Sequence, residues 1–442
     1  MHSWLIVGSM FPLLFLCIFL GFPVAFSLIA LAFFYGISIF GTAIAHQILG
    51  TVYTVCTSYE YAAVPLFVFM GTILEHSGLA GKLFKAINLW TGRIPGGLGV
   101  GTIIMATIFA AASGIIGAVE VIVGLFAIPI MLKHNYEKGL IAGTICAGGA
   151  LGTIIPPSII AVIYAPMANI SIGALLMGIV FPGLLLSASY IIYIFGRCVI
   201  RPEDGPRLSK EEMAEHRFLA KIAITLQSLI PPMILIFAVM GSIILGYAAP
   251  TEAAALGVLG SVLLCIGYGQ FTFKLLKDTV IDVAKVTAMI MFIIVGGNAF
   301  AGVFIANGGG SLIEDLIRTL NLSSFAMMLL FLFIGFLAGF VLDCYSIMLV
   351  FVPIFAPLVP KSGLDPLWFA VLFMLIIQTS YITPPMAPSI FYLKGIAPKE
   401  ITVRHMFTGI VPFVVCQWVV ICLVLAFPKL GTWLPSIALS FR

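Results

Sequence analysis

The sequence predicts an all-α polytopic membrane protein made of two inverted repeats, each with about five crossings and one re-entrant helical hairpin. Of its 442 residues, 62% are hydrophobic and only 9% are charged, whereas roughly 25% of residues are charged in soluble proteins. Residues 1–59, 139–196 and 366–393 contain no Asp, Glu, Lys or Arg. Because a helix needs about 20 apolar residues to cross a bilayer, the chain has material for roughly ten to twelve spans.

The first repeat, residues 1–196, is predicted from apolar runs between polar or helix-breaking residues. Its predicted crossings are 3–20, 23–41, 61–78, 139–165 and 172–196. Segment 97–132 is too long for one span and is interrupted at Ser113 and Gly114, so we expect a hairpin that enters and leaves on one side. The first basic residue is Lys82, so the apolar N-terminus is predicted to be a span and not a cleaved leader.

The second repeat, residues 222–442, is predicted to follow the same order. Its crossings are 222–245, 252–270, 286–306, 366–393 and 405–428, with a hairpin at 325–360 that is broken near Asp343. A polar linker at 197–221 joins the repeats as a solvated connection, and Ser209 is predicted to begin a short capped helix there. Segments 79–90 and 273–285 mix Lys with apolar residues at helical spacing, which indicates helices lying on the membrane surface.

The distribution of Lys and Arg predicts the orientation, because cytoplasmic loops accumulate these residues. With the N-terminus outside, 17 of the 21 fall in cytoplasmic segments, and the other four are Arg318, Lys361, Lys429 and Arg442. Both termini are therefore predicted to lie outside, on the non-cytoplasmic side, and the linker to be cytoplasmic. The odd number of crossings in each half then makes the two halves inverted with respect to one another.

A double proline interrupts a crossing in each half. Pro156-Pro157 matches Pro384-Pro385 at an offset of 228 residues. Prolines lack a backbone donor, so the first pair frees the carbonyls one turn earlier, at Gly152 and Thr153, and the second pair does the same at 380 and 381. Such carbonyls must be buried in protein or line a polar cavity, where they suit a bare Na⁺. A simple kink is the structural alternative.

Two acidic residues lie inside the hairpins. Asp343 stands at the break of the second hairpin, and a carboxylate inside a membrane is costly and usually functional. The alternative is that Asp343 caps the helix that starts at Tyr345. Glu120 is the only ionisable residue between Arg93 and Lys133, and it could accept a proton, contact the substrate or face a water-filled crevice.

Several function classes find no support in the sequence. The motifs His-Glu-x-x-His and Gly-x-Ser-x-Gly are absent, so no enzyme activity is predicted. The eight cysteines lack disulfide or metal-ligand spacing. A net charge of +4 fits an excess of cytoplasmic Lys and Arg, and does not imply nucleic acid as a partner.

These motifs together resemble those of the large membrane subunit of tripartite ATP-independent periplasmic (TRAP) transporters, over almost the whole chain. The most specific are Ala-Ala-Ser-Gly at 111–114, Gly-Thr-Ile-Ile-Pro-Pro-Ser at 152–158, Phe-Pro-Gly at 181–183, Pro-Thr-Glu at 250–252 and Ile-Thr-Pro-Pro at 382–385. The resemblance implies sodium-coupled import of a small organic acid across the bacterial inner membrane. It implies two partners as well, a small four-helix membrane subunit and a periplasmic substrate-binding protein, neither of which is fused to this chain.

The resemblance also implies site residues and a mechanism. One sodium site would use Ser113, Gly114, Gly152, Thr153 and Ser158, and the other would use Asp343, Thr379 and Thr383. Substrate contacts are expected from Ser113, Glu120, Pro156 and Pro384, and Na⁺ is the coupling ion, with no organic cofactor and no other metal. In an elevator mechanism, the hairpins and broken helices at 97–170 and 325–397 would slide against scaffold helices at 1–92 and 222–320, with a last helix at 405–428.

The sequence departs from the common family pattern after Gly114, where Ile115 and Ile116 replace small hydroxylated residues. Asp343-Cys344, the Gln-Thr-Ser-Tyr of 378–381 and the segment 391–398 look like the branch associated with 2-oxo acids, lactate and similar carboxylates. Three alternatives stay open: a standalone organic-anion carrier, a passive channel, and an intramembrane hydrolase that would pair Asp343 with Glu120.

Overall fold

The computed structural model describes residues 2–114, 117–208, 218–384 and 387–440, and all regular structure in these ranges is helical. Seven helical stretches are long and apolar enough to cross a membrane, and an eighth candidate, Tyr59–His76 with Leu79–Thr91, is bent by 65°. The broken crossings are not among the seven, because their interruption leaves each helical piece short. The predicted all-α, multi-span membrane fold is confirmed.

The helices of the first half are α1 (His2–Phe19), α2 (Val24–Phe40), η1 (Gly41–Ala43), α3 (Ile44–Thr57), η2 (Tyr59–Ala62), α4 (Ala63–His76), α5 (Leu79–Thr91), α6 (Gly97–Ser113), α7 (Ala118–Lys133), α8 (Lys138–Ala150), η3 (Leu151–Thr153), α9 (Ile159–Met167), α10 (Ile172–Gly178), α11 (Val180–Ile200) and η4 (Pro202–Asp204). The helices of the second half are α13 (Phe218–Ile244), α14 (Pro250–Gly267), α15 (Phe273–Ala306), α16 (Gly309–Thr319), α17 (Ser324–Ala338), α18 (Cys344–Phe355), α19 (Leu358–Lys361), α20 (Pro366–Ile382), α21 (Pro388–Ile396), α22 (Val403–Ala426) and α23 (Lys429–Ser440).

Several elements differ from the sequence-based assignment. Helix α3 follows α2 after a single 3₁₀ turn, and helix α23 follows α22, where no helix had been expected. Segments 273–285 and 286–306 were predicted as a surface helix and a separate crossing, but they form one 34-residue helix, α15. Nothing in 273–306 breaks a helix, since this segment contains no proline and its Lys and Asp residues are tolerated on an exposed face.

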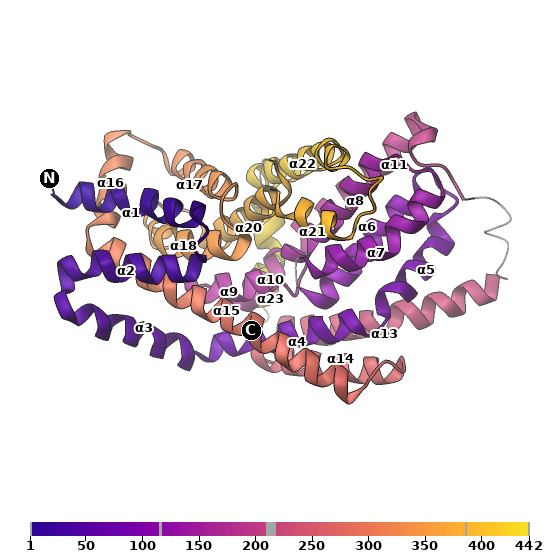
Figure 1. Ribbon diagram of the computed structural model, residues 1–442, viewed down its shortest axis with the longest axis horizontal. Coiled ribbons are helices and arrows are strands. Elements are labelled where there is room, and N and C mark those ends of the chain that lie inside the picture. The colour runs from indigo at the N-terminus through magenta and orange to yellow at the C-terminus, as the bar shows by residue number, and fades with distance from the viewer. Residues whose placement is uncertain (1, 115–116, 209–217, 385–386, 441–442) are drawn as a thin grey trace.

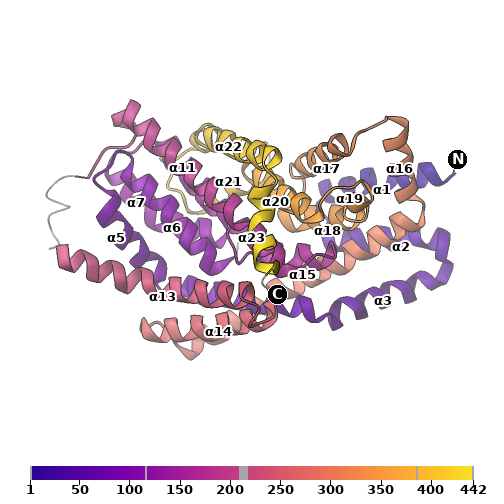
Figure 2. The ribbon, with the colours of Figure 1, turned by 180° about the vertical axis from the view of Figure 1, so that it is seen from behind.

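A belt of long helices forms one layer of the molecule. In Figures 1 and 2 it runs along the lower edge, with α3 and α2 at one end, α15 in the middle and α14 and α13 at the other end. Helix α15 packs against α2, α3 and α4, and α14 packs between α4 and α13. Their outer faces carry exposed large apolar side chains such as Phe237 and Leu259, as expected for surfaces that face lipid.

The hairpins and broken helices form the other layer, above the belt. The hairpin α6–α7 packs with α8 on one side, and the hairpin α17–α18 packs with α20 on the other side (Figure 1). Helix α22 lies between them and contacts both α8 and α20. A close approach of small residues holds α22 on α8, because Gly409 lies directly against the backbone of Gly139.

Matching residues of the two halves have the same backbone conformation and the same helix-capping role. Asn135 and Gly363, which correspond at the offset of 228, both have a left-handed backbone, with φ of 56° and 76°. Two residues later, Glu137 accepts hydrogen bonds from the N–H groups of residues 139 and 140, and Asp365 accepts them from residues 367 and 368, so each carboxylate caps the broken crossing that follows. The match in sequence is therefore a match in backbone conformation and capping.

The first part of the linker packs on the protein, which corrects the expectation of a solvated connection. Asp204 is buried and binds Arg197 at 2.8 Å, and Arg197 also reaches Glu137 at 3.2 Å. Backbone hydrogen bonds join Gly96 to Gly205 and Gly92 to Leu208. These contacts tie the end of α11 to the starts of α6 and α8. The capped helix expected from Ser209 lies outside the described residues.

Candidate functional site

The tip of the first hairpin lies on the break of the first interrupted crossing. Helix α6 ends at Ser113, and Gly114 follows in the left-handed conformation with φ of 64°. A Cβ atom on Gly114 would lie 2.6 Å from the carbonyl oxygen of Pro157, so this contact requires glycine. Ser113 is buried, and its hydroxyl has no hydrogen-bond partner within the described ranges. Residues 115 and 116 lie outside the described part of the chain.

The break between α8 and α9 is rich in buried oxygen atoms. The Thr153 hydroxyl donates to the carbonyl of Ala150 at 2.9 Å, and the Ser158 hydroxyl donates to the carbonyl of Thr153 at 2.6 Å. Pro156 is buried in the same turn. Gly114 thus lies against Pro157 at the break, with Ser113 next to it in the chain, and a hydrogen bond joins Ser158 to Thr153. Gly152 lies in the same 3₁₀ turn as Thr153.

The second half repeats this arrangement. Gly339, just after α17, lies so close to α20 that an added Cβ atom would collide with the side chain of Ser380. The hydroxyls of Thr379 and Thr383 donate to the carbonyls of Leu375 and Thr379, at 2.8 and 2.5 Å. Each hairpin tip therefore touches the interrupted crossing of its own half. Pro384 is half-buried at this break, and Pro385 lies outside the described residues.

Asp343 takes the capping position that was weighed as its structural alternative. One carboxylate oxygen accepts the N–H of Tyr345 at 3.1 Å, and the other accepts the hydroxyl of Ser346. The residue is exposed, and within the described ranges no hydrogen bond joins it to Thr379 or Thr383. Capping leaves lone pairs on both carboxylate oxygens, so the cap and a role as an ion ligand are compatible.

A hydrogen bond between the two halves joins the sites. Glu120, in the first turn of α7, is completely buried, and the Tyr381 hydroxyl of α20 donates to one of its carboxylate oxygens at 3.2 Å. Gly149 of α8 packs directly against the backbone of Glu120. Tyr392 of α21 packs on Gly117, which immediately precedes α7 in the same hairpin. The first hairpin therefore contacts the interrupted crossings of both halves.

Sequence reasoning missed most of the polar side chains around Glu120. The thiol of Cys146 lies next to Glu120 and Ser389, and Tyr381 lies within electrostatic range of Cys344 and Tyr392. Tyr381 had a signal in the sequence, because it corresponds to Thr153 at the offset of 228. Gln378 is a further candidate, because its amide is buried and neither of its polar atoms has a partner within the described part of the chain.

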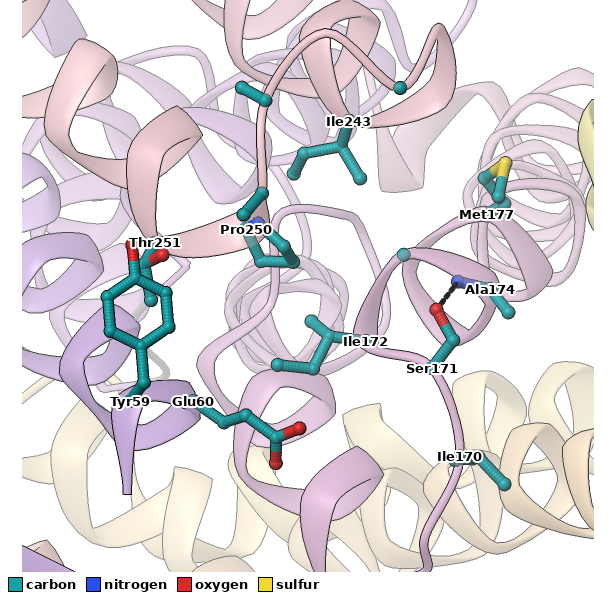
Figure 3. Close-up of a pocket in the computed structure, with 14 residues that line it drawn as sticks. Tyr59, Glu60, Ile170, Ser171, Ile172, Ala174, Met177, Ile243, Pro250 and Thr251 are labelled. Atoms are coloured by element: carbon teal, nitrogen blue, oxygen red, sulfur yellow. Dashed lines mark hydrogen bonds between the residues drawn. The ribbon is translucent and has the colours of Figure 1, made fainter. Parts of the chain in front are cut away.

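A separate cavity of about 420 Å³ opens where η2, the segment before α10 and the start of α14 meet. Figure 3 shows Glu60, Ser171 and Pro250 around it, with the Ser171 hydroxyl accepting the N–H of Ala174. None of the predicted site residues lines this cavity. Next to the cavity, Glu252 in the first turn of α14 accepts the N–H of Ala249 at 2.8 Å and so caps this helix.

The arrangement at the breaks suits the binding of a hard cation more than covalent chemistry. Hydroxyls, freed carbonyls and carboxylates are the ligands that such cations prefer. No group of three or more His, Cys, Asp or Glu residues with metal-binding geometry occurs within the described ranges. No Lys or Arg lies between residues 97 and 132 or between 366 and 393. The site is therefore oxygen-rich and acidic, and it is buried around the first break and at Glu120, whereas Asp343 is exposed.

Comparisons with known proteins agree with this architecture. The family model described as "Tripartite ATP-independent periplasmic transporter, DctM component" matches residues 11–430. The C4-dicarboxylate TRAP transporter large permease protein DctM of Pseudomonas aeruginosa is 29% identical, with 86% of each chain covered. The sialic acid TRAP transporter large permease protein SiaM of Vibrio cholerae is 28% identical, with 98% of this chain and 99% of that protein covered.

Two further similarities extend these matches. The 2,3-diketo-L-gulonate TRAP transporter large permease protein YiaN of Escherichia coli is 27% identical, with 93% of this chain and 94% of that protein covered. The crystal structure of the Alcanivorax borkumensis YdaH transporter shares the fold, with a TM-score of 0.64 at 13% identity, over 89% of this chain and 90% of that chain. With the family model matched over nearly its whole length, this chain belongs to the DctM component family of tripartite ATP-independent periplasmic transporters, whose members are transport subunits and not enzymes.

Proposed function

We propose that this chain performs sodium-coupled import of a small organic acid. The observation that carries the proposal is the paired contact of each hairpin tip with an interrupted crossing, at Gly114 with Pro157 and at Gly339 with Ser380. Paired interrupted helices are typical of secondary transporters, whose ion and substrate sites lie at the breaks. The system is ATP-independent by family, so another gradient must drive accumulation.

The first sodium ion is proposed to bind at Ser113, Gly114, Gly152, Thr153 and Ser158. The unpartnered, buried hydroxyl of Ser113 supports this site, since a buried oxygen without a hydrogen-bond partner is costly unless a ligand satisfies it. The hydroxyls of Thr153 and Ser158 already donate their protons to carbonyls, so their free lone pairs are available to a cation. All three side chains are buried, as a dehydrated ion requires.

The second sodium ion is proposed to bind at Asp343, Thr379 and Thr383. Thr379 and Thr383 follow one another by one helical turn, and both hydroxyls donate to carbonyls, which leaves their lone pairs available as they are in the first set. Asp343 would supply the negative charge. In this arrangement its cap on α18 would hold the carboxylate in place before the ion arrives.

The charges of the site explain why an anionic substrate would need sodium. Glu120 and Asp343 are both acidic, and no Lys or Arg lies in the middle of either hairpin or of either interrupted crossing. A carboxylate substrate would therefore be repelled unless bound cations and helix N-termini offset its charge. We propose that Ser113, Glu120, Pro156 and Pro384 contact the substrate, with Tyr381 orienting the Glu120 carboxyl group.

The substrate class rests on the names of the relatives and on the resemblance of this sequence. C4-dicarboxylates, sialic acid and 2,3-diketo-L-gulonate are the substrates named for the three relatives described above. For this chain we propose a small carboxylate of the 2-oxo acid or lactate type. The supporting residues are Asp343-Cys344 and the segment 378–381.

The proposed setting is the bacterial inner membrane, with both termini periplasmic and residues 197–221 cytoplasmic. The proposed partners are a small membrane subunit of about four helices and a periplasmic protein that delivers the substrate. In the proposed elevator step, the hairpins α6–α7 and α17–α18 move with the interrupted crossings against the belt of α2, α3, α4, α13, α14 and α15. The layered packing described above is what supports this division.

Uptake into proteoliposomes tests the proposal. The chain and its small partner would be reconstituted, with and without the periplasmic receptor, under an inward Na⁺ gradient and with a panel of labelled carboxylates. Concentrative uptake that needs both sodium and receptor is the expected result. Receptor-independent uptake would indicate a standalone carrier, and flux that is indifferent to the sodium gradient would contradict the proposal.

A further inference from the structure

A cavity of about 510 Å³ lies between α5, α13 and α14, away from the hairpins and interrupted crossings. Its lining includes Lys82 and Lys85 of α5, Gln227 and Ser228 of α13, and Tyr268 at the end of α14. None of these residues has a part in the proposed transport function. Two basic groups and two further hydrogen-bond donors therefore face one cavity, which is large enough for a phosphate-sized group.

The two lysines have no carboxylate partner. Within the described ranges the ion pairs involve Arg197, Lys285 and Lys361, and neither Lys82 nor Lys85 takes part. The Lys82 ammonium lies 3.7 Å above the ring of Tyr268, which is a cation–π contact near the carbonyl end of α14. Lys85 has no comparable contact within the described ranges, so its ammonium group faces the cavity without an interaction partner in the protein.

Ser228 is the second indication of a ligand. Its side chain is only 4% exposed, and its hydroxyl makes no hydrogen bond within the described part of the chain. Because Ser228 lines the cavity, its hydroxyl can donate a hydrogen bond to a group bound there. The neighbouring Gln227 is exposed and contributes an amide that can donate to the same ligand.

The surroundings of the cavity are those of a membrane interface. Helix α5 buries Leu83 and Ile87 and turns its lysines outward, and Trp90 at its end is 47% exposed. On α13, Leu226 is 49% exposed, one residue away from Gln227. On α14, Ile266 is 51% exposed, two residues before Tyr268. Apolar faces that suit acyl chains therefore adjoin a polar cavity that suits a head group.

We propose that this cavity binds the phosphate of an anionic phospholipid. The ammonium groups of Lys82 and Lys85 would offset its charge, and Ser228 and Gln227 would donate hydrogen bonds to its oxygens. Its acyl chains would lie along the exposed apolar faces of α13 and α14. Basic pockets between membrane helices are suited to such head groups, because desolvated phosphate needs both charge and donors. A bound lipid would hold α5 against α13 and α14 of the belt.

Native mass spectrometry of the purified full-length chain tests the proposal. Binding of phosphatidylglycerol, phosphatidylcholine and soluble glycerol 3-phosphate would be compared for the wild type, Lys85→Gln and the double variant Lys82→Gln/Lys85→Gln. Phosphatidylglycerol affinity should fall by about 5-fold for each lysine removed, or roughly 25-fold for both. Phosphatidylcholine binding should stay unchanged, and glycerol 3-phosphate should bind far more weakly than the lipid.

The matched control is Lys274→Gln/Lys277→Gln, which removes two exposed lysines of α15 that do not line the cavity. An equal loss of affinity in this control would show general charge attraction and would overturn the proposal. Equal binding of the two lipids would overturn it as well. Strong binding of glycerol 3-phosphate without a preference for lipid would assign the cavity to a soluble phosphate instead. Lys85 is exposed and unpaired, so Lys85→Gln should fold normally.

Discussion

The bond between Tyr381 and Glu120 is the most informative single contact in the molecule, because it joins residues 261 positions apart at the meeting point of both halves. Glu120 is fully buried, and the Tyr381 hydroxyl donates a hydrogen bond to its carboxyl group at 3.2 Å. A buried carboxyl group depends on such a donor, because an unsatisfied one costs about 1–3 kcal/mol or more. The hydrogen bond from Tyr381 to Glu120 therefore couples the first hairpin to the second interrupted crossing.

Replacing Tyr381 by Phe tests this coupling. The Tyr381→Phe variant should lower the apparent melting temperature and reduce sodium-driven uptake, because the carboxyl group loses its donor at a cost of about 1–3 kcal/mol. Tyr164→Phe is the matched control, since Tyr164 is equally buried and makes no hydrogen bond within the described ranges. Equal effects of the two substitutions on melting and uptake would argue against a special role of Tyr381.

Asp343 allows the cap and the ion ligand to be separated. Asn caps helices about as well as Asp, so Asp343→Asn should leave assembly nearly unchanged. The sodium concentration for half-maximal uptake should nevertheless rise by roughly tenfold or more, because the charge is lost. Asp365→Asn is the control, because Asp365 caps α20 in the same way. An unchanged sodium dependence in Asp343→Asn would remove this residue from the site.

At the scale of elements, the crossing of α8 and α22 depends on glycine. A Cβ atom on Gly409 would collide with the backbone of Gly139, and one on Gly143 would collide with the backbone of Gly409. We predict that Gly409→Ala destabilises the protein by about 1–3 kcal/mol through overpacking, measured as a lower apparent melting temperature. Gly241→Ala in α13 meets open space and should be neutral or stabilising. Melting temperatures that fall equally would contradict this account of the crossing.

The sequence predicted the elements that have strong boundaries and missed those that lack them. The hairpin tips and interrupted crossings were found because Gly114, Asp343 and the double prolines mark them. Helix α3 was missed because it has only 14 residues and includes polar ones such as His46 and Gln47, so it did not meet the length and apolar content expected of a crossing. The union of 273–306 into α15 depends on its packing against α2, α3 and α4, which a single sequence does not reveal.

The candidate site was predictable in its backbone and much less so in its side chains. The double prolines identify the breaks from local chemistry alone, and both breaks occur where they were predicted. The carbonyl of Ser380, which was expected to be free, accepts the N–H of Thr383 at 3.2 Å. The partnership of Glu120 with Tyr381 depends on how hairpin and crossing pack across the two halves. For Asp343 the sequence left two roles open, helix cap and ion ligand, and the structure shows the cap on α18.

At the scale of the whole molecule, the central claim is that the hairpin tips and interrupted crossings bind Na⁺. If the native state binds sodium and the unfolded state does not, sodium at 100 times its dissociation constant stabilises the protein by about 2.7 kcal/mol per site. Potassium is too large for a site built around a dehydrated sodium ion and should have little effect at the same ionic strength.

The most direct test is the apparent melting temperature of the purified chain during titration with NaCl against KCl. We predict a rise that is specific to sodium, that saturates, and that is reduced by Ser113→Ala and by Thr379→Ala, one substitution in each proposed site. Curves that coincide for sodium and potassium would contradict the account, because they would show that neither break binds the coupling ion.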